Sequence, residues 1–173
     1  SRISLVSQRP NDYHPDHRNV GVLVQDAAYM VTVPYFCPDV PYLASNPVFL
    51  YYEDRFTKPT RFAGDVVVGI DDTIEKKLAA VAALESQFAE GGCNGGPHLV
   101  PNRADVAQTA KRRQEVVQSF QGRFAATANR FAAELRERYG VDKAKGIKHA
   151  EAFEICEYGR MPSKEELKKL FPF

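Results

Sequence analysis

The sequence has few cysteines and no long apolar run. Its three cysteines, Cys37, Cys93 and Cys156, are widely separated and form no CxxC pair. Neither a disulfide framework nor a structural zinc knuckle is therefore indicated, and a reducing, cytoplasmic compartment is expected. No stretch approaches the roughly 20 apolar residues that a membrane-spanning helix needs. The N-terminus also lacks a basic region followed by an apolar core, so we expect no membrane span.

The chain has almost no net charge. Its 23 basic and 22 acidic residues leave a formal charge of +1. Such a balance gives no global field that attracts nucleic acid or an anionic membrane, and a small neutral or weakly charged substrate fits better. With 173 residues, 44% hydrophobic and 26% charged, disordered and fibrous classes are also excluded. We expect a single domain over residues 1–173.

Strand and helix patterns alternate along the chain. Short apolar runs rich in β-branched and aromatic residues predict strands at residues 3–7, 48–52 and 65–70. Apolar spacings of three and four predict a helix over residues 18–30, and four prolines predict a surface loop after it. Asp72 and Glu75 have the form of a capping box that opens a helix to about residue 90. This alternation is typical of an α/β fold.

A proline-free segment over residues 104–139 predicts one long helix, or two joined near Gly122. Its aromatic stripe indicates core or subunit contact, and its interleaved arginines and glutamates indicate a solvated face. Ser163 and Glu166 form a second capping box and predict a short terminal helix. The glycine-rich residues 91–98 match no phosphate-binding spacing, so a flexible loop with a solvated His98 is expected.

The candidate catalytic and metal-binding residues lie close together in the segment Asp12-Tyr13-His14-Pro15-Asp16-His17-Arg18. His14 and His17, three residues apart, can lie on one side of a helical turn and share a metal. The alternative is a polar helix start, with Asp16 as a negative charge favoured by the helix dipole. A catalytic zinc takes about three protein ligands, which this segment cannot supply by itself.

The segment Arg9-Pro10-Asn11-Asp12-Tyr13-His14-Pro15-Asp16-His17-Arg18 resembles the second metal-site motif of the LmbE-like (PIG-L) zinc-dependent N-deacetylases. Further similarities follow in order at Gln25-Asp26-Ala27-Ala28, Asn46-Pro47-Val48, Asp65-Val66-Val67-Val68, Ile70-Asp71, Glu75-Lys76-Lys77, Ser86-Gln87 and Ala150-Glu151-Ala152-Phe153-Glu154. The likeness covers residues 1–90 and about 147–162. Residues 104–140 look like a long helical insertion specific to a subgroup.

The resemblance implies an α/β fold, a Rossmann-like three-layer sandwich, here incomplete at its N-terminal side and with a long C-terminal helix. It also implies a hydrolase that removes the N-acetyl group from an N-acetylglucosamine-type sugar or conjugate. His17 would be a ligand of Zn²⁺ or another divalent metal. His14 would stabilise the oxyanion and protonate the leaving amine, with Asp16 orienting it, while Asp12 and Tyr13 would touch substrate at the rim. Amide hydrolysis needs these functions, and zinc supplies the nucleophile by lowering the pKa of its bound water from about 16 towards about 7.

The family also has an earlier His-Pro-Asp-Asp segment, which carries two further zinc ligands and the general base, and this sequence contains no such segment. We therefore expect the chain to be the C-terminal part of a longer deacetylase. Alone it should bind zinc weakly or not at all and should not catalyse. A complementing N-terminal fragment or a homo-oligomer is the expected protein partner. The alternative hypothesis is a noncatalytic binding or assembly module with a degenerate deacetylase fold.

Overall fold

The structure, a computed structural model, describes residues 3–92, 95, 96, 99 and 104–172. His98 and Cys93 of the predicted glycine-rich loop lie outside these residues. The elements follow in the order β1 (Ile3–Ser7), α1 (Pro15–Met30), β2 (Val48–Tyr52), β3 (Val66–Gly69), a 3₁₀ turn (Asp71–Thr73), α2 (Ile74–Ala82), a π-helical turn (Glu85–Ala89), α3 (Val106–Arg130), α4 (Ala132–Tyr139), α5 (Val141–Gly146), β4 (Ala150–Ile155) and α6 (Lys164–Leu170).

The chain divides into two compact units. Unit 1 comprises Ser1–Val68 and Ala152–Phe173, and unit 2 comprises Gly69–Glu151. The chain thus leaves unit 1 near the end of β3 and returns to it early in β4. The expectation that residues 1–173 form one domain stays a prediction.

A small sheet with the strand order β1-β2-β4-β3 forms the centre of unit 1. The predicted strands over residues 3–7 and 48–52 are confirmed as β1 and β2, which pair in parallel with Ser7 opposite Tyr51. β4 runs antiparallel to β2, with Leu50 opposite Ile155. Four successive residues of β2, from Val48 to Tyr51, are buried, as expected for a strand covered on both faces.

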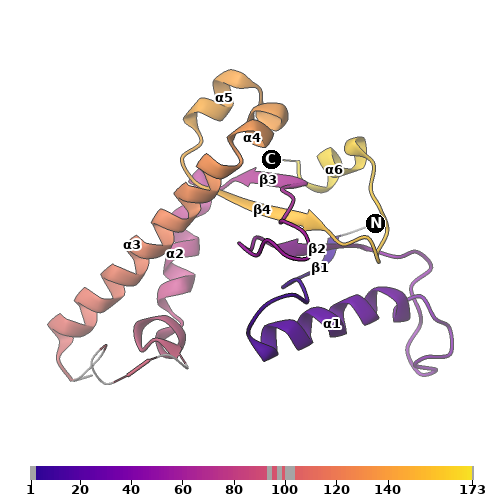
Figure 1. Ribbon diagram of the computed structural model, residues 1–173, viewed down its shortest axis with the longest axis horizontal. Coiled ribbons are helices and arrows are strands. Elements are labelled where there is room, and N and C mark those ends of the chain that lie inside the picture. Colours follow the sequence, from indigo (N-terminus) through magenta and orange to yellow (C-terminus); the bar gives the residue numbers. More distant parts are fainter. Residues whose placement is uncertain (1–2, 93–94, 97–98, 100–103, 173) are drawn as a thin grey trace. The chain divides into compact units, whose positions relative to one another are not determined.

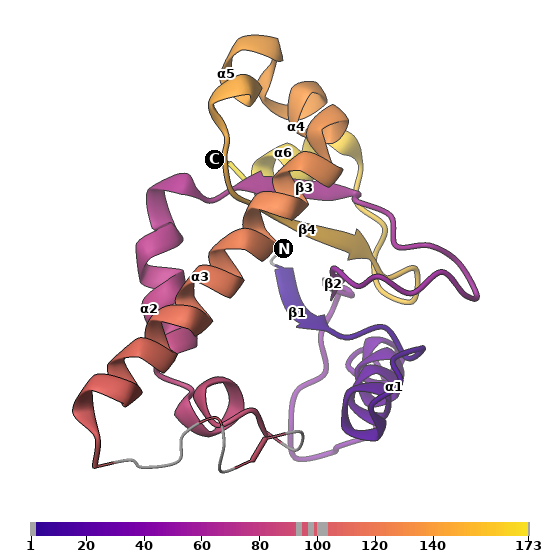
Figure 2. The same cartoon turned by 60° about the vertical axis from the view of Figure 1, so that its left-hand side comes forward.

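Helix α1 covers one face of this sheet. Figures 1 and 2 both show it beside β1 and β2, and its buried residues are Gly21 and Ala28. Ala28 of α1 is buried in a cluster with Phe49, Tyr51 and Cys156. The Tyr51 hydroxyl donates to Cys156 Sγ (2.9 Å) and accepts from Gln25 Nε2 (2.6 Å). Burial raises the pKa of Tyr51 above its ordinary value, so its hydroxyl keeps its proton.

The predicted Rossmann-like three-layer sandwich is wrong. A doubly wound sheet is mostly parallel, whereas β4 is antiparallel to β2 in a sheet of only four strands. More of the described chain lies in helices than in strands. The longest helix, α3, is also not C-terminal, because α4, α5, β4 and α6 follow it.

Unit 2 is helical, and α2 packs side by side with α3 (Figures 1 and 2). The predicted aromatic stripe forms its core: Phe120 lies 4.6 Å from Phe88 between ring centroids, and Phe131 and Leu135 are buried. The long helix breaks at Phe131 rather than near Gly122. The predicted capping box at Asp72 is wrong, because this residue lies in a 3₁₀ turn and no side chain caps α2.

The capping box at the start of α6 is confirmed. Ser163 Oγ accepts from Glu166 N, and the Glu166 carboxylate accepts from Ser163 N. This backbone hydrogen bond, together with Arg160, lowers the pKa of Glu166. Across the residues that the structure describes, no helix is long and apolar enough to cross a membrane.

Candidate functional site

The residues between β1 and α1 fold into a loop organised by the Asp12 carboxylate. Asp12 is buried, although it was expected at the rim. Its Oδ1 accepts from His14 N (2.8 Å), a side-chain turn that aspartate forms two residues ahead of a backbone N–H. Arg18 Nη1 donates to Asp12 O (3.1 Å) and so ties the loop to the helix that follows. Both candidate histidines are therefore positioned by the same aspartate and its neighbours.

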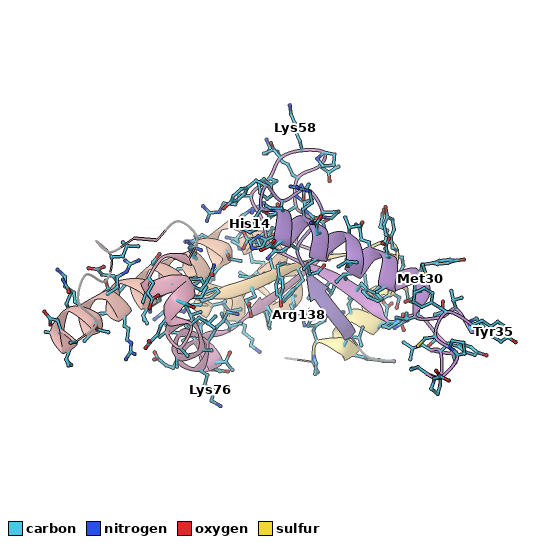
Figure 3. All side chains as sticks on the ribbon, turned by 90° about the horizontal axis from the view of Figure 1, so that it is seen from below. His14, Met30, Tyr35, Lys58, Lys76 and Arg138 are labelled. Carbon is cyan, nitrogen blue, oxygen red and sulfur yellow. The ribbon has the colours of Figure 1, made fainter. Side chains whose placement is uncertain are left out.

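The histidines lie at the start of α1, which begins three residues earlier than predicted. His14 is the N-cap residue, and Pro15 occupies the first helical position, where its missing N–H costs nothing. His17 falls in the first turn, as expected. The two imidazole rings lie 4.7 Å apart between centroids with planes inclined by 31°. Figure 3 shows His14 at this end of α1 and Met30 at the other.

The hydrogen bonds place the ring protons of the two histidines on different nitrogens. His14 Nδ1 accepts from Asp16 N (3.3 Å), so the proton of the neutral His14 ring lies on Nε2. His17 Nδ1 lies 3.1 Å from Asp12 Oδ2, and an ionised carboxylate only accepts, so Nδ1 carries the His17 proton. In the neutral forms of the two rings, His17 thus presents an Nε2 lone pair and His14 presents an Nε2–H donor.

Asp16 and Tyr13 are more exposed than Asp12. The Asp16 carboxylate is 85% exposed and lies 3.9 Å from His14 Nδ1, beyond hydrogen-bond distance, so Asp16 contacts His14 through its backbone N–H. Tyr13 is exposed, with its ring edge-on to the rings of His14 and Phe56. Its place at the rim of a site and its contact with substrate stay predictions.

Arg9 anchors the site loop to the segment that follows β2. Its guanidinium donates twice to Asp54, from Nε to Oδ2 (2.6 Å) and from Nη2 to Oδ1 (2.8 Å). Nη1 donates to Thr60 O and lies 3.5 Å from Glu154 Oε2. Burial opposes the charge on Arg9, but the hydrogen bonds and charges of these carboxylates outweigh it and raise the pKa of Arg9. Sequence analysis missed this network, because no local pattern indicates a pair 45 residues apart.

Unit 1 also contains a cavity of about 530 Å³ beside α1. Gln25, Tyr51, Arg61, Glu157 and Tyr158 are among the side chains that line it. Its wall also includes Thr60 and Glu154, which both contact Arg9, the residue that anchors the histidine loop. The volume is in the range of small-molecule sites, and the amide, carboxylate, hydroxyl and guanidinium groups can bind a hydroxyl-rich ligand.

His17 has the arrangement of a metal-ligating histidine, since its second ring nitrogen is held by a carboxylate. One such ligand does not make a zinc site. Among the described residues, no group of three or more His, Cys, Asp and Glu side chains is placed to hold a metal ion. The described part of the chain therefore offers one histidine in such an arrangement, not the three protein ligands that a catalytic zinc takes.

Comparisons with known proteins bear on the fold. No protein-family model matches the sequence. Among solved structures, the chain is similar to GalB, the 4-carboxy-2-hydroxymuconate hydratase from Pseudomonas putida KT2440, with a TM-score of 0.50 and 16% sequence identity. The match covers 92% of this chain and 53% of GalB, so the chain spans about half the length of that protein. The fold is thus one that occurs in an enzyme.

Proposed function

We propose that this chain carries part of the active site of a zinc-dependent hydrolase that removes an N-acetyl group from an N-acetylglucosamine-type sugar or conjugate. The observation that carries the proposal is the pair of contacts made by two adjacent histidines: His14 Nδ1 accepts from Asp16 N, and His17 Nδ1 lies 3.1 Å from Asp12 Oδ2, so both Nε2 atoms are left for other partners. Amide hydrolysis with a metal needs a nitrogen lone pair that binds the metal, which His17 Nε2 can supply. It also needs a hydrogen-bond donor to the carbonyl oxygen, which His14 Nε2–H can supply. The resemblance of the surrounding motif to the N-deacetylases supplies the reaction class.

The two histidines and Asp12 then have separate tasks. His17 would hold the metal through Nε2, and the buried Asp12 would keep His17 in the required tautomer. His14 would donate from Nε2 to the carbonyl oxygen as negative charge develops there. As the imidazolium, with a second proton on Nδ1 on the side of the Asp16 carboxylate, it would give the Nε2 proton to the departing nitrogen and become neutral. The metal, when bound, supplies an activated water. The cavity beside α1 would receive the sugar. The remaining ligands and the general base would come from a segment outside the described residues or from a complementing chain.

The test is acetate release from N-acetylglucosamine conjugates by the longest natural form of the protein that contains this chain. We expect activity to disappear with a chelator and in His17→Ala, and kcat to fall about 10²–10⁴-fold in His14→Ala. Chelator-resistant hydrolysis, or full activity of His17→Ala, would contradict the proposal. An inactive long form that still binds the sugar would instead support the alternative, a noncatalytic binding module.

The tautomers give a prediction that needs no catalysis. Long-range ¹⁵N NMR of the chain alone is expected to show His17 unprotonated at Nε2 and His14 unprotonated at Nδ1. Asp12→Asn should move the His17 proton to Nε2, because the new amide can donate to Nδ1, and should weaken metal binding about 10–100-fold in the long form. Asp16→Asn is the matched control, since its carboxylate is exposed and should leave both properties unchanged. Equal effects of the two variants would refute the role of Asp12.

A further inference from the structure

Unit 2 is one continuous segment of the chain, whereas unit 1 is built from the two ends of the chain. The chain leaves unit 1 between Val68 and Gly69, in β3, and returns to it between Glu151 and Ala152, in β4. These two strands are neighbours in the sheet. Unit 2 therefore has the chain course of a segment inserted between two adjacent strands.

The two ends of unit 2 are fastened to each other by the Asp71 carboxylate. Asp71 Oδ2 accepts from Lys148 N (2.9 Å), and Asp71 Oδ1 accepts from His149 N (3.1 Å). The same Oδ1 lies 2.7 Å from His149 Nδ1, which carries the ring proton because an ionised carboxylate only accepts. One side chain thus holds three N–H groups from the other end of the unit. We call Asp71, Lys148 and His149 the latch.

Further contacts within unit 2 begin at its first residue and reach its last. Gly69 N donates to the Tyr139 hydroxyl (3.1 Å), and Lys77 forms an ion pair with Glu151. The helices of the unit also supply buried apolar side chains: Ile74, Leu78, Val116, Phe131 and Leu135. Joined ends and buried apolar side chains are the features of a segment that folds and unfolds cooperatively.

We propose that unit 2 is an inserted segment that opens and closes as one cooperative unit, separately from unit 1, and that the latch holds it closed. Opening of the latch deprives three N–H groups of an ionised acceptor. The side chain of His149 is only 14% exposed, so water replaces the carboxylate poorly in the closed form. The proposal does not rest on the hydrolase function, because no latch residue belongs to the histidine loop.

The proposal has a consequence for the candidate site. Asp12 and His17, and also the Arg9 to Asp54 ion pair that anchors their loop, belong to unit 1. Unit 2 could therefore open while the contact between Asp12 and His17 stays formed. The latch would then set how often unit 2 is open without changing the geometry of the histidine pair.

Hydrogen exchange measured by NMR on the 173-residue chain tests the latch. In Asp71→Ala we expect the slow amide protons of α2 and α3 to exchange about 10–100-fold faster, as for the loss of one or two hydrogen bonds to a charged group. Exchange in β1 and β2 and the ring signals of His17 should stay unchanged. Asp72→Ala is the matched control, because Asp72 is the next residue of the same 3₁₀ turn and is exposed. Equal exchange rates in the two variants would overturn the role of the latch.

The unmodified chain gives a second measurement, which needs no substitution. As urea is added at low concentration, the slow amides of α2, α3 and α4 are expected to converge on one free energy of opening with one dependence on urea. The slow amides of β1 and β2 should converge on a different value. One common value for both units would overturn the proposal that unit 2 opens separately, and so would separate values for each helix of unit 2.

Discussion

Arg9→Met is expected to lower the free energy of unfolding by about 3–5 kcal/mol, the range for breaking a buried ion pair by removal of one partner. The side chains of Arg9 and Asp54 are only 6% and 8% exposed. Without the guanidinium, Asp54 loses two hydrogen bonds and Glu154 loses its neighbouring positive charge. Both carboxylates then remain in a poorly solvated place. Urea unfolding followed by circular dichroism measures the loss.

Three further variants show whether the loss of stability comes from the missing charge, the missing hydrogen bonds or the unpaired carboxylate. Arg9→Lys keeps the charge but cannot donate twice to one carboxylate in the same geometry, so an intermediate loss is expected. Arg9→Met combined with Asp54→Leu should recover much of the stability, because the stranded charge is removed with its partner. Arg55→Met is the control, since Arg55 is an exposed arginine next to Asp54 in the segment that follows β2, and a change within about 0.5 kcal/mol is expected. Similar losses for Arg9→Met and Arg55→Met would refute the anchoring role of Arg9.

The elements that sequence analysis located correctly are those with a strong local signal. β1 and β2 are short runs of β-branched and aromatic residues bounded by turn residues, and their predicted limits match the structure. Ser163 and Glu166 form the predicted capping box because its two hydrogen bonds need only residues three apart. Each of these signals is complete within a few residues, so the rest of the fold does not change it.

β4 was missed although its signal is present. Ala150-Glu151-Ala152 alternates apolar and charged residues, the period of a half-buried strand, although Phe153 then interrupts the alternation. The segment was considered only for its resemblance to a family motif. The wrong fold class was implied by the resemblance, and β4 is the strand that makes the sheet mixed. Its pairing partner, β2, lies about a hundred residues earlier, and no local pattern gives the direction of such a pairing.

For the candidate site, the sequence located the histidine segment but not the positions of its carboxylates. The resemblance implied that Asp16 orients His14. In the structure the first turn of α1 points the Asp16 carboxylate into solvent, and the loop before α1 folds Asp12 inward. A usable signal existed: an aspartate two residues before the N-cap can accept from the N-cap N–H, as Asp12 does.

Gly21→Ala is expected to destabilise the protein by about 1–3 kcal/mol, although alanine is the better helix former by about 1 kcal/mol. Gly21 lies in the middle of α1, where the helix touches the backbone of the site loop. A Cβ at this position would lie 2.7 Å from Gln8 O and 3.2 Å from Pro10 N. Both are main-chain atoms, which cannot rotate away, so helix and loop must separate. This movement would disturb the Asp12 to His17 contact as well as the packing.

Gly122→Ala is the matched control, because Gly122 also lies within a helix, α3, but a Cβ there meets nothing within 4 Å. Without a clash, the higher helix propensity of alanine decides the effect, and the free energy of unfolding is expected to rise by about 0.5–1 kcal/mol. The two substitutions are chemically identical, so opposite signs in urea unfolding would isolate the contact between α1 and the loop. The same samples should show altered His17 imidazole signals in Gly21→Ala alone. Stabilisation by both variants would mean that the site loop does not depend on close contact with α1.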